Sequence, residues 1–284
     1  MSAAQPVTPE LRKWIVEQAT AGQPPEAVLK SMLASGWREE VAVAAMEETL
    51  TGFLDQHAKA AGLPAPSIVP EPIAGEVVSH LPAGDRQVQV LLSMRNPRVI
   101  VFGSLLSDDE CDELVNLAQQ RLARSETVKM DTGDSEVNEA RTSDGMFFNR
   151  GENPLCARIE ARIAALLGWP LENGEGLQVL RYRPGAEYKP HYDYFDPAQP
   201  GTPSILKRGG QRVGSLVMYL NSPARGGSTV FPDVHLDVAP VKGNAVFFSY
   251  DRPHPMTRSL HGGAPVVEGE KWVATKWLRE GRFE

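Results

Sequence analysis

The chain is poor in cysteine, has no long apolar run and carries no excess of positive charge. Cys111 and Cys156 are its only cysteines, which argues against a disulfide framework and favours a reducing compartment, the cytoplasm. No run of about 18 apolar residues is present, so we expect no membrane span. The first ten residues also lack the basic and apolar segments of a secretory signal.

Negative charge exceeds positive charge, with 36 Asp and Glu against 29 Lys and Arg and a formal net charge of −7. We therefore do not expect a surface that binds nucleic acid through its phosphates. The content of 42% hydrophobic and 23% charged residues is ordinary for a soluble globular protein. A length of 284 residues allows one well-buried domain of about 200 residues and a small appendage.

The appendage is expected at the N-terminus, in residues 1–56. Prolines mark the starts of two short helices there, and a third helix is expected over residues 38–50. So small a module is typical of an element that binds a protein partner or self-associates; the alternative is a solvated extension without a partner. Residues 57–85, rich in Pro, Ala and Gly, are expected to form an extended linker. The main domain is expected over residues 86–284.

The main domain begins with helical patterns and ends in short strands. Ser107 and Glu110 form a capping box before one helix, and Asn153 precedes another. The C-terminal part consists of short β-type runs separated by Gly, Pro, Asn and Asp, as in a sandwich or barrel. We predict a mostly β, α+β domain: a double-stranded β-helix, or jelly roll, with supporting helices. Residues 128–140 and 195–212 are candidate lids over a site.

A candidate metal site lies in His191-Tyr192-Asp193. Alternate residues of a strand point to one face, so His191 and Asp193 can both point inward. With one distant histidine they would form a two-His-one-carboxylate set, which binds Fe(II) and leaves three positions open. Both His254 and His261 lie in the region from which that histidine would come. The three other histidines lie in or beside the linker or in a predicted hairpin and are expected at the surface.

Further motifs follow along the main domain: LQV at 177–179 with Tyr182, HYD at 191–193, GGSTVFP at 226–232, KGNAVFF at 242–248, HGGAPV at 261–266 and GEKWVATKW at 269–277. With these motifs, residues 98–284 resemble the catalytic domain of the collagen-type prolyl 4-hydroxylases, which are Fe(II)/2-oxoglutarate dioxygenases. The N-terminal 85 residues lie outside the resemblance.

The resemblance implies which residues hold the metal. It makes His191, Asp193 and His261 the ligands of Fe(II), and it favours His261 over His254 because His261 has a proline and a lysine at the family's spacing. It also implies 2-oxoglutarate and O2 as co-substrates and ascorbate as the reductant. Beyond the metal centre it implies no further catalytic side chain.

The resemblance also implies a binding site for 2-oxoglutarate. Lys271 would pair with the distal carboxylate of the co-substrate, Tyr182 would hydrogen-bond the same carboxylate, and Thr229 would line the pocket. The alternative for Tyr182 and Thr229 is that both are ordinary inward-facing strand residues. Lys276 competes with Lys271, but five residues along one strand the two side chains should face opposite sides.

The substrate is less well determined than the reaction class. The resemblance implies a peptidyl proline, with Arg141, Tyr192 and Trp272 as candidate contacts. Trp277 is expected, with Trp272, to wall the site. The alternatives are a surface salt bridge for Arg141 and a core position for both tryptophans. A free amino acid or small metabolite could be hydroxylated on the same scaffold. A non-catalytic metal-binding jelly roll is the remaining alternative, against which the complete set of ligands and Lys271 argues.

Overall fold

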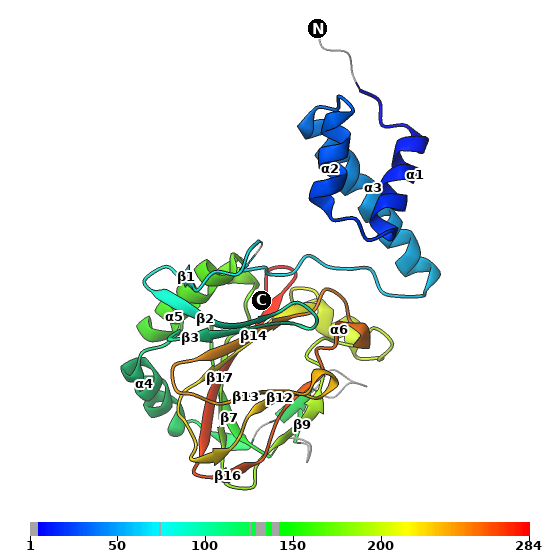
Figure 1. Cartoon of the computed structure of the whole chain (residues 1–284). Helices are drawn as coiled ribbons and strands as arrows, with labels where there is room; N and C mark the ends of the chain where they lie inside the picture. The colour runs from blue at the N-terminus through cyan, green and yellow to red at the C-terminus, as the bar shows by residue number, and fades with distance from the viewer. Residues whose placement is uncertain (1–4, 74, 125, 129–134, 138–141) are drawn as a thin grey trace. The chain divides into compact units, whose positions relative to one another are not determined.

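The computed structural model describes residues 5–73, 75–124, 126–128, 135–137 and 142–284 (Figure 1). The chain divides into two compact units, Met1–Ala65 and Pro66–Glu284. Among the described residues, no helix combines the length and the apolar character needed to cross a membrane.

Three helices make up the N-terminal unit: α1 (Pro9–Thr20), α2 (Pro25–Ala34) and α3 (Glu39–Ala60). The side chain of Thr8 accepts a hydrogen bond from the first turn of α1 and caps that helix. The three helices enclose a small apolar core of their own, in which Ile15 is fully buried.

Residues 57–85, expected as an extended linker, are partly taken up by a helix and a strand. Helix α3 takes up the first of these residues and ends only at Ala60. At the other end, β1 (His80–Pro82) pairs with β2 (Gln87–Met94), and Ala83 is fully buried in the core of the second unit. Backbone pairing and burial thus attach the last part of the expected linker to the larger unit. A Pro-rich and Ala-rich composition does not reveal these contacts.

The larger unit is built on a nine-stranded antiparallel sheet with the order β1-β2-β3-β14-β10-β17-β8-β7-β4 (Figure 1). Its remaining strands are β3 (Arg98–Gly103), β14 (Ala245–Ser249), β10 (Arg212–Tyr219), β17 (Lys271–Arg279), β8 (Leu177–Tyr182), β7 (Asp144–Phe148) and β4 (Ala123–Arg124). The last strand of the chain therefore lies in the middle of the sheet, between strands from earlier in the sequence.

A four-stranded sheet faces it, with the order β13 (Leu236–Val238), β12 (Thr229–Phe231), β15 (His261–Gly263) and β9 (Tyr188–His191). Two short pairs complete the strands: β11 (Arg225–Gly226) with β16 (Val266–Glu268), and β5 (Glu126–Val128) with β6 (Ser135–Val137). The short helices are α6 (Thr202–Leu206), η1 (Leu171–Asn173), η2 (Pro232–Val234) and η3 (Pro255–Thr257).

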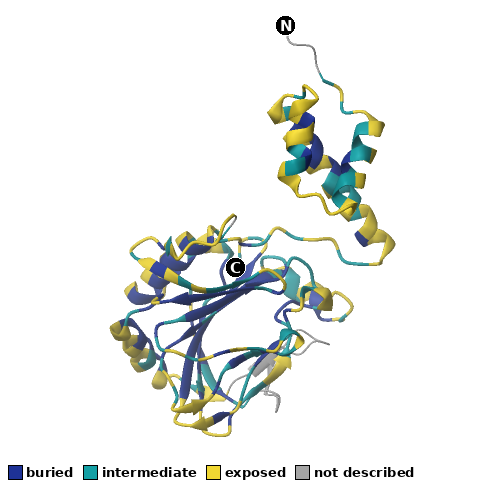
Figure 2. Ribbon diagram, in the orientation of Figure 1, coloured by how far each residue is buried: buried dark blue, intermediate teal, exposed yellow. Residues whose placement is uncertain are grey.

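Two helices pack on the outer face of the nine-stranded sheet, α4 (Asp108–Gln119) and α5 (Pro154–Leu167). The capping box of Ser107 and Glu110 is present at the start of α4, and Asn153 caps α5. Both helix starts are therefore confirmed. The buried sides of the helices and the outward side chains of the sheet form one core. In Figure 2 the ribbons of the central strands are coloured as buried along most of their length.

A second core fills the space between the two sheets and contains Tyr182, Tyr219, Phe231, Phe248 and Val273. Because alternate residues of each central strand point to opposite faces, the strands of the large sheet contribute to both cores. Two facing antiparallel sheets with helices outside one of them confirm the predicted jelly roll with supporting helices.

Candidate active site

The register of the four-stranded sheet brings together histidines that are far apart in the sequence. His191 on β9 pairs directly with His261 on β15, and the centroids of their rings are 4.4 Å apart. Asp193 follows just beyond β9, with one carboxylate oxygen 3.5 Å from Nε2 of His191 and the other 3.5 Å from Nε2 of His261. One ligand atom from each of the three residues lies within 4.8 Å of the others.

Backbone carbonyls orient both imidazole rings. Nδ1 of His191 lies 2.9 Å from the carbonyl oxygen of Lys189, and Nδ1 of His261 lies 3.0 Å from that of Ser259. A carbonyl oxygen can only accept, so Nδ1 carries the proton in each ring and Nε2 keeps its lone pair. Both unprotonated nitrogens therefore face Asp193, which is the orientation that a metal ion needs.

Burial and charge keep the buried ligands in the protonation state that a metal requires. Burial lowers the pKa of His261 to about 4, so its ring is neutral at pH 7. Burial alone would raise the pKa of Asp193, but the two imidazoles hold it well below its usual value. Two imidazoles and one carboxylate on one side of a cavity match the donor set of Fe(II) oxygenases and leave three coordination positions open.

A buried lysine lies in the same pocket. Lys271 is 4% exposed and stands directly opposite Tyr182 in the pairing of β17 with β8. Its ammonium lies over the rings of Tyr182 and Tyr219, and the hydroxyl of Tyr219 donates to Thr229, which lines the pocket as well. Within the described part of the chain it has no carboxylate or hydrogen-bond partner, and burial lowers its pKa to about 8. Such a group is suited to bind an anion.

The alternation of β17 decides which of its residues reach this pocket. Lys271, Val273, Thr275 and Trp277 line it. Lys276 faces the other side and forms a buried ion pair with Glu160 of α5, as the strand argument predicted. Trp272 also lies on that other side, in the outer core, which corrects the expectation that it contacts the substrate.

Of the two tryptophans expected to wall the site, Trp277 lines the pocket and Trp272 does not. The indole N–H of Trp277 is buried and has no hydrogen-bond partner among the described residues. Tyr188 was not expected at the site, although its ring stacks on that of His191 at 3.7 Å between centroids. An even spacing from Lys271 along the strand indicates Trp277, whereas nothing in the sequence indicates the stacking of Tyr188.

The other candidates lie elsewhere. Tyr192 is half-buried against Tyr194 and does not line the pocket. His254 accepts a hydrogen bond from the backbone N–H of Met256 and caps η3. It is not part of the cluster of possible ligands found among the described residues. Arg141 lies outside the described residues.

The two segments expected as lids do not contribute to the described lining of the metal pocket. Residues 195–212 instead line a second cavity through Phe195, Ile205, Arg208 and Arg212. Most of residues 128–140 lie outside the described part of the chain.

Comparisons with known proteins agree with this geometry. Residues 177–279 match the family model of the 2OG-Fe(II) oxygenase superfamily. Prolyl 4-hydroxylase 2 of Arabidopsis thaliana is 39% identical over 213 residues, which cover 66% of this chain and 69% of the relative. Prolyl 4-hydroxylase 1 of the same plant is 42% identical over 203 residues, which cover 65% and 70%.

Solved structures give a further similarity. The 2OG complex of a viral collagen prolyl hydroxylase from Paramecium Bursaria Chlorella virus-1 covers 64% of this chain and 95% of its own, with 30% identity and a TM-score of 0.49.

The chain is a member of the 2OG-Fe(II) oxygenase superfamily and belongs, within it, to the prolyl 4-hydroxylase family. It is accordingly a 2-oxoglutarate-dependent dioxygenase that uses Fe(II). The non-catalytic alternative raised by the sequence is thereby set aside.

Proposed function

We propose that this enzyme hydroxylates proline residues at the 4-position in a peptide or protein and couples that hydroxylation to the conversion of 2-oxoglutarate to succinate and CO2. The observation that carries the proposal is one pocket in which the His191, Asp193 and His261 cluster lies beside the buried ammonium of Lys271. The relatives at 39% and 42% identity, which are named prolyl 4-hydroxylases, support proline as the substrate.

In this proposal, His191, Asp193 and His261 hold Fe(II) through Nε2, a carboxylate oxygen and Nε2. The support is the donor set and the tautomers imposed by the carbonyls of Lys189 and Ser259. When bound, the ion supplies the activation of O2 that hydroxylation requires. We further propose ascorbate as the reductant that maintains Fe(II), and the cytoplasm as the location, in line with two buried free cysteines.

Lys271 holds the distal carboxylate of 2-oxoglutarate, and Tyr182 and Thr229 complete that end of the pocket. A buried ammonium without a partner gains more from an anion than an exposed one does, because little water screens the pair. Thr229 is fixed by the hydroxyl of Tyr219, at 2.8 Å. The direct pairing of Lys271 with Tyr182 across β17 and β8, and the position of the ammonium over the Tyr182 ring, support a role for Tyr182 in binding the same anion.

Trp277 and Arg141 are the proposed contacts of the substrate. The indole N–H of Trp277, unpaired among the described residues, is a buried donor in the pocket and suits a carbonyl oxygen of a peptide. For Arg141 the support is the resemblance alone. The next residue, Thr142, is tied to Glu187 by two hydrogen bonds, one from and one to its hydroxyl.

The test incubates the enzyme with Fe(II), 2-oxoglutarate and a set of proline-containing peptides, and measures succinate and hydroxyproline in the same samples. We expect one 4-hydroxyproline for each succinate, and no turnover in His191→Ala or Asp193→Ala. His254→Ala is the matched control, because it removes a histidine that lies near in sequence but caps η3, and it should keep full activity.

Two results would contradict the proposal. Turnover of free proline or another small molecule, with none of any peptide, would assign the enzyme to the small-molecule hydroxylases. Full activity in His191→Ala or Asp193→Ala would contradict the assignment of the metal ligands.

We also propose that the N-terminal helical unit, expected over residues 1–56 and extended by α3 to Ala60, is a separate docking or self-association element, and that the larger unit is the catalytic domain. The separate core of the three N-terminal helices supports this division. Sedimentation of the full chain at several concentrations distinguishes self-association, which raises the mass with concentration, from docking to another protein, which does not.

A further inference from the structure

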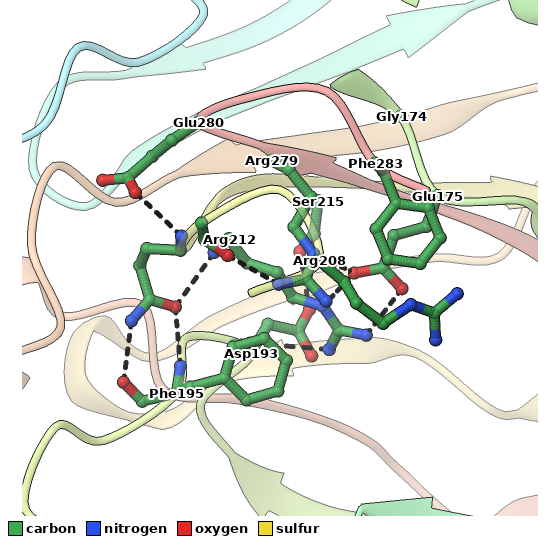
Figure 3. Close-up of polar contacts among 12 residues, drawn as sticks. Gly174, Glu175, Asp193, Phe195, Arg208, Arg212, Ser215, Arg279, Glu280 and Phe283 are labelled. Atoms are coloured by element: carbon green, nitrogen blue, oxygen red, sulfur yellow. Dashed lines mark hydrogen bonds and ion pairs between the residues drawn. The ribbon is translucent and has the colours of Figure 1, made fainter. Parts of the chain in front are cut away.

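A hydroxyl group that is not among the proposed metal ligands forms a hydrogen bond with the carboxylate of Asp193. Ser215 of β10 donates to Oδ2 of Asp193 at 2.6 Å (Figure 3). Ser215 has no exposed surface and stands in a run of apolar residues, with Phe248 and Trp277 as its strand partners. A buried hydroxyl is costly unless it is hydrogen-bonded, so its place in this strand depends on Asp193.

A second hydroxyl supports the first. The phenol oxygen of Tyr250 lies 3.0 Å from Oγ of Ser215. An ionised carboxylate only accepts, so Ser215 gives its single proton to Asp193 and must accept from Tyr250. Burial raises the pKa of Tyr250 well above its usual value, which keeps its proton available for that bond. The two hydroxyls thus form a chain in which each bond strengthens the next.

The backbone of Asp193 is held from the same side. Arg212 approaches the carbonyl oxygen of Asp193 at 3.5 Å, and its guanidinium is fixed by two hydrogen bonds to the carboxylate of Glu175 (Figure 3). Arg279 binds that carboxylate too. Asp193 lies just after the end of β9, beyond the residues that the strand pairing fixes, so these contacts determine its position.

We propose that Ser215, supported by Tyr250, is a positioning residue that makes Asp193 a ligand through one oxygen. Ser215 engages Oδ2, which leaves Oδ1 for the metal. A carboxylate that binds through both oxygens takes two coordination positions, whereas 2-oxoglutarate and O2 need three positions to stay open. The inference rests on the proposed metal site and does not depend on which substrate is hydroxylated.

Binding of Mn(II) to the metal-free full chain, without 2-oxoglutarate or peptide, tests the inference. Partners of a ligating group typically contribute about 10–100-fold to metal affinity, so Ser215→Ala should weaken Mn(II) binding by about tenfold or more. Tyr250→Phe should give a smaller loss, because it leaves the bond between Ser215 and Asp193 in place. Ser215→Thr keeps the hydroxyl and should restore affinity relative to Ser215→Ala.

Ser249→Ala is the matched control. Ser249 is also a buried serine, on the neighbouring strand β14, but its hydroxyl has no hydrogen-bond partner among the described residues. Its removal should leave Mn(II) affinity unchanged. The visible absorption of bound Co(II), which depends on coordination number, should change in Ser215→Ala and stay the same in Ser249→Ala. Thermal unfolding of the metal-free variants checks that they are folded. If Ser215→Ala is not folded, Ser215→Cys is used in its place.

Two results would overturn the inference: Mn(II) affinity within about twofold of the parent in folded Ser215→Ala, or an equal loss in Ser249→Ala. His191→Ala separates this failure from that of the proposed metal site. If His191→Ala binds Mn(II) as tightly as the parent does, the metal site itself is misassigned. If His191→Ala loses Mn(II) affinity and Ser215→Ala does not, the proposed metal site is supported and the proposed role of Ser215 is contradicted.

Discussion

The two faces of β17 carry two buried lysines in opposite circumstances. Lys276 is 2% exposed and forms an ion pair with Glu160 of α5 on the outer face. Lys271 is 4% exposed on the inner face and has no anionic partner among the described residues. Burial lowers the pKa of both ammonium groups. The difference is that the fold itself supplies the counter-charge of Lys276, whereas we propose that 2-oxoglutarate supplies that of Lys271.

A buried charge that is paired within the protein and a buried charge that is proposed to bind a ligand thus differ in their surroundings. A buried charge that is paired within the protein is satisfied in every state of the enzyme. A buried charge without a partner raises the free energy of the folded state, and this unfavourable contribution is offset only when an anion binds. Exposure and residue type are nearly identical for the two lysines, so neither property distinguishes their roles. Only their neighbours do.

The largest effect is expected for Lys276→Met. The substitution leaves the carboxylate of Glu160 buried without its partner, which should lower the free energy of unfolding by about 3–5 kcal/mol. Urea unfolding measures this change in the free energy of unfolding. The double variant Glu160→Leu with Lys276→Met removes both charges and should recover most of the loss. A single variant as stable as the parent would show that the ion pair is not needed by the fold.

The same substitution at Lys271 should act in the opposite direction on stability. At pH 7 it removes an ammonium whose pKa falls from 10.5 to about 8 on burial, so the free energy of unfolding should rise by up to about 3 kcal/mol. Affinity for 2-oxoglutarate should fall by about 2 kcal/mol or more, which is at least about thirtyfold.

Calorimetry with 2-oxoglutarate in the presence of Mn(II) measures this loss, and Mn(II) binding alone is the control. The proposed role of Lys271 requires that metal affinity change much less than affinity for the co-substrate. Equal losses of the two would count against it, and Lys276→Met, in its folded form, should retain both.

A smaller effect is expected from pH. The ammonium of Lys271 is present below its pKa of about 8 and is lost above it. Affinity of the parent for 2-oxoglutarate should therefore be constant up to about pH 8 and then fall by up to about tenfold for each further pH unit. Lys271→Arg keeps its charge over this range, so the affinity of that variant should not show this fall. The same dependence in both proteins would assign the pH effect to another group.

Stability of the metal-free parent should show the matching linkage. The folded-state pKa of Lys271, about 8, lies below the unfolded value of 10.5, so the unfolded chain binds more protons between these two pH values. Burial of the ammonium destabilises the fold below that window, and the destabilisation disappears as pH rises through it. Urea unfolding across this pH range measures the effect, and Lys271→Met should lack the rise in stability.

Strand alternation predicted much of the site, and it also explains where the prediction failed. It predicted that Lys271 and Lys276 point to opposite faces. It was also applied to His191 and Asp193, but β9 ends at His191, so alternation along a strand does not explain why these two side chains lie together. Trp272 was expected to contact the substrate, but it adjoins Lys271 in the strand, and adjacent residues of a strand point to opposite faces. Trp277 lies an even number of residues from Lys271, so the same rule places both side chains on the inner face of β17.

Sequence patterns do not predict several of the side-chain contacts at the site. The bond from Ser215 to Asp193 joins segments of different sheets, and the stacking of Tyr188 on His191 depends on ring orientation. The linker was also overestimated, because β1 and Ala83 are held by pairing and burial against residues distant in sequence. Composition reveals none of these long-range contacts.

The sequence by itself determined the class of the enzyme, the helix starts and the candidate metal-binding set, because local spacing and ordered motifs encode them. The tertiary structure decided which lysine the fold pairs, which tryptophan reaches the pocket and which hydroxyl holds Asp193. The physical reason is that a strand specifies only the face to which a side chain points. What meets it on that face depends on the register and packing of strands that come from distant parts of the chain.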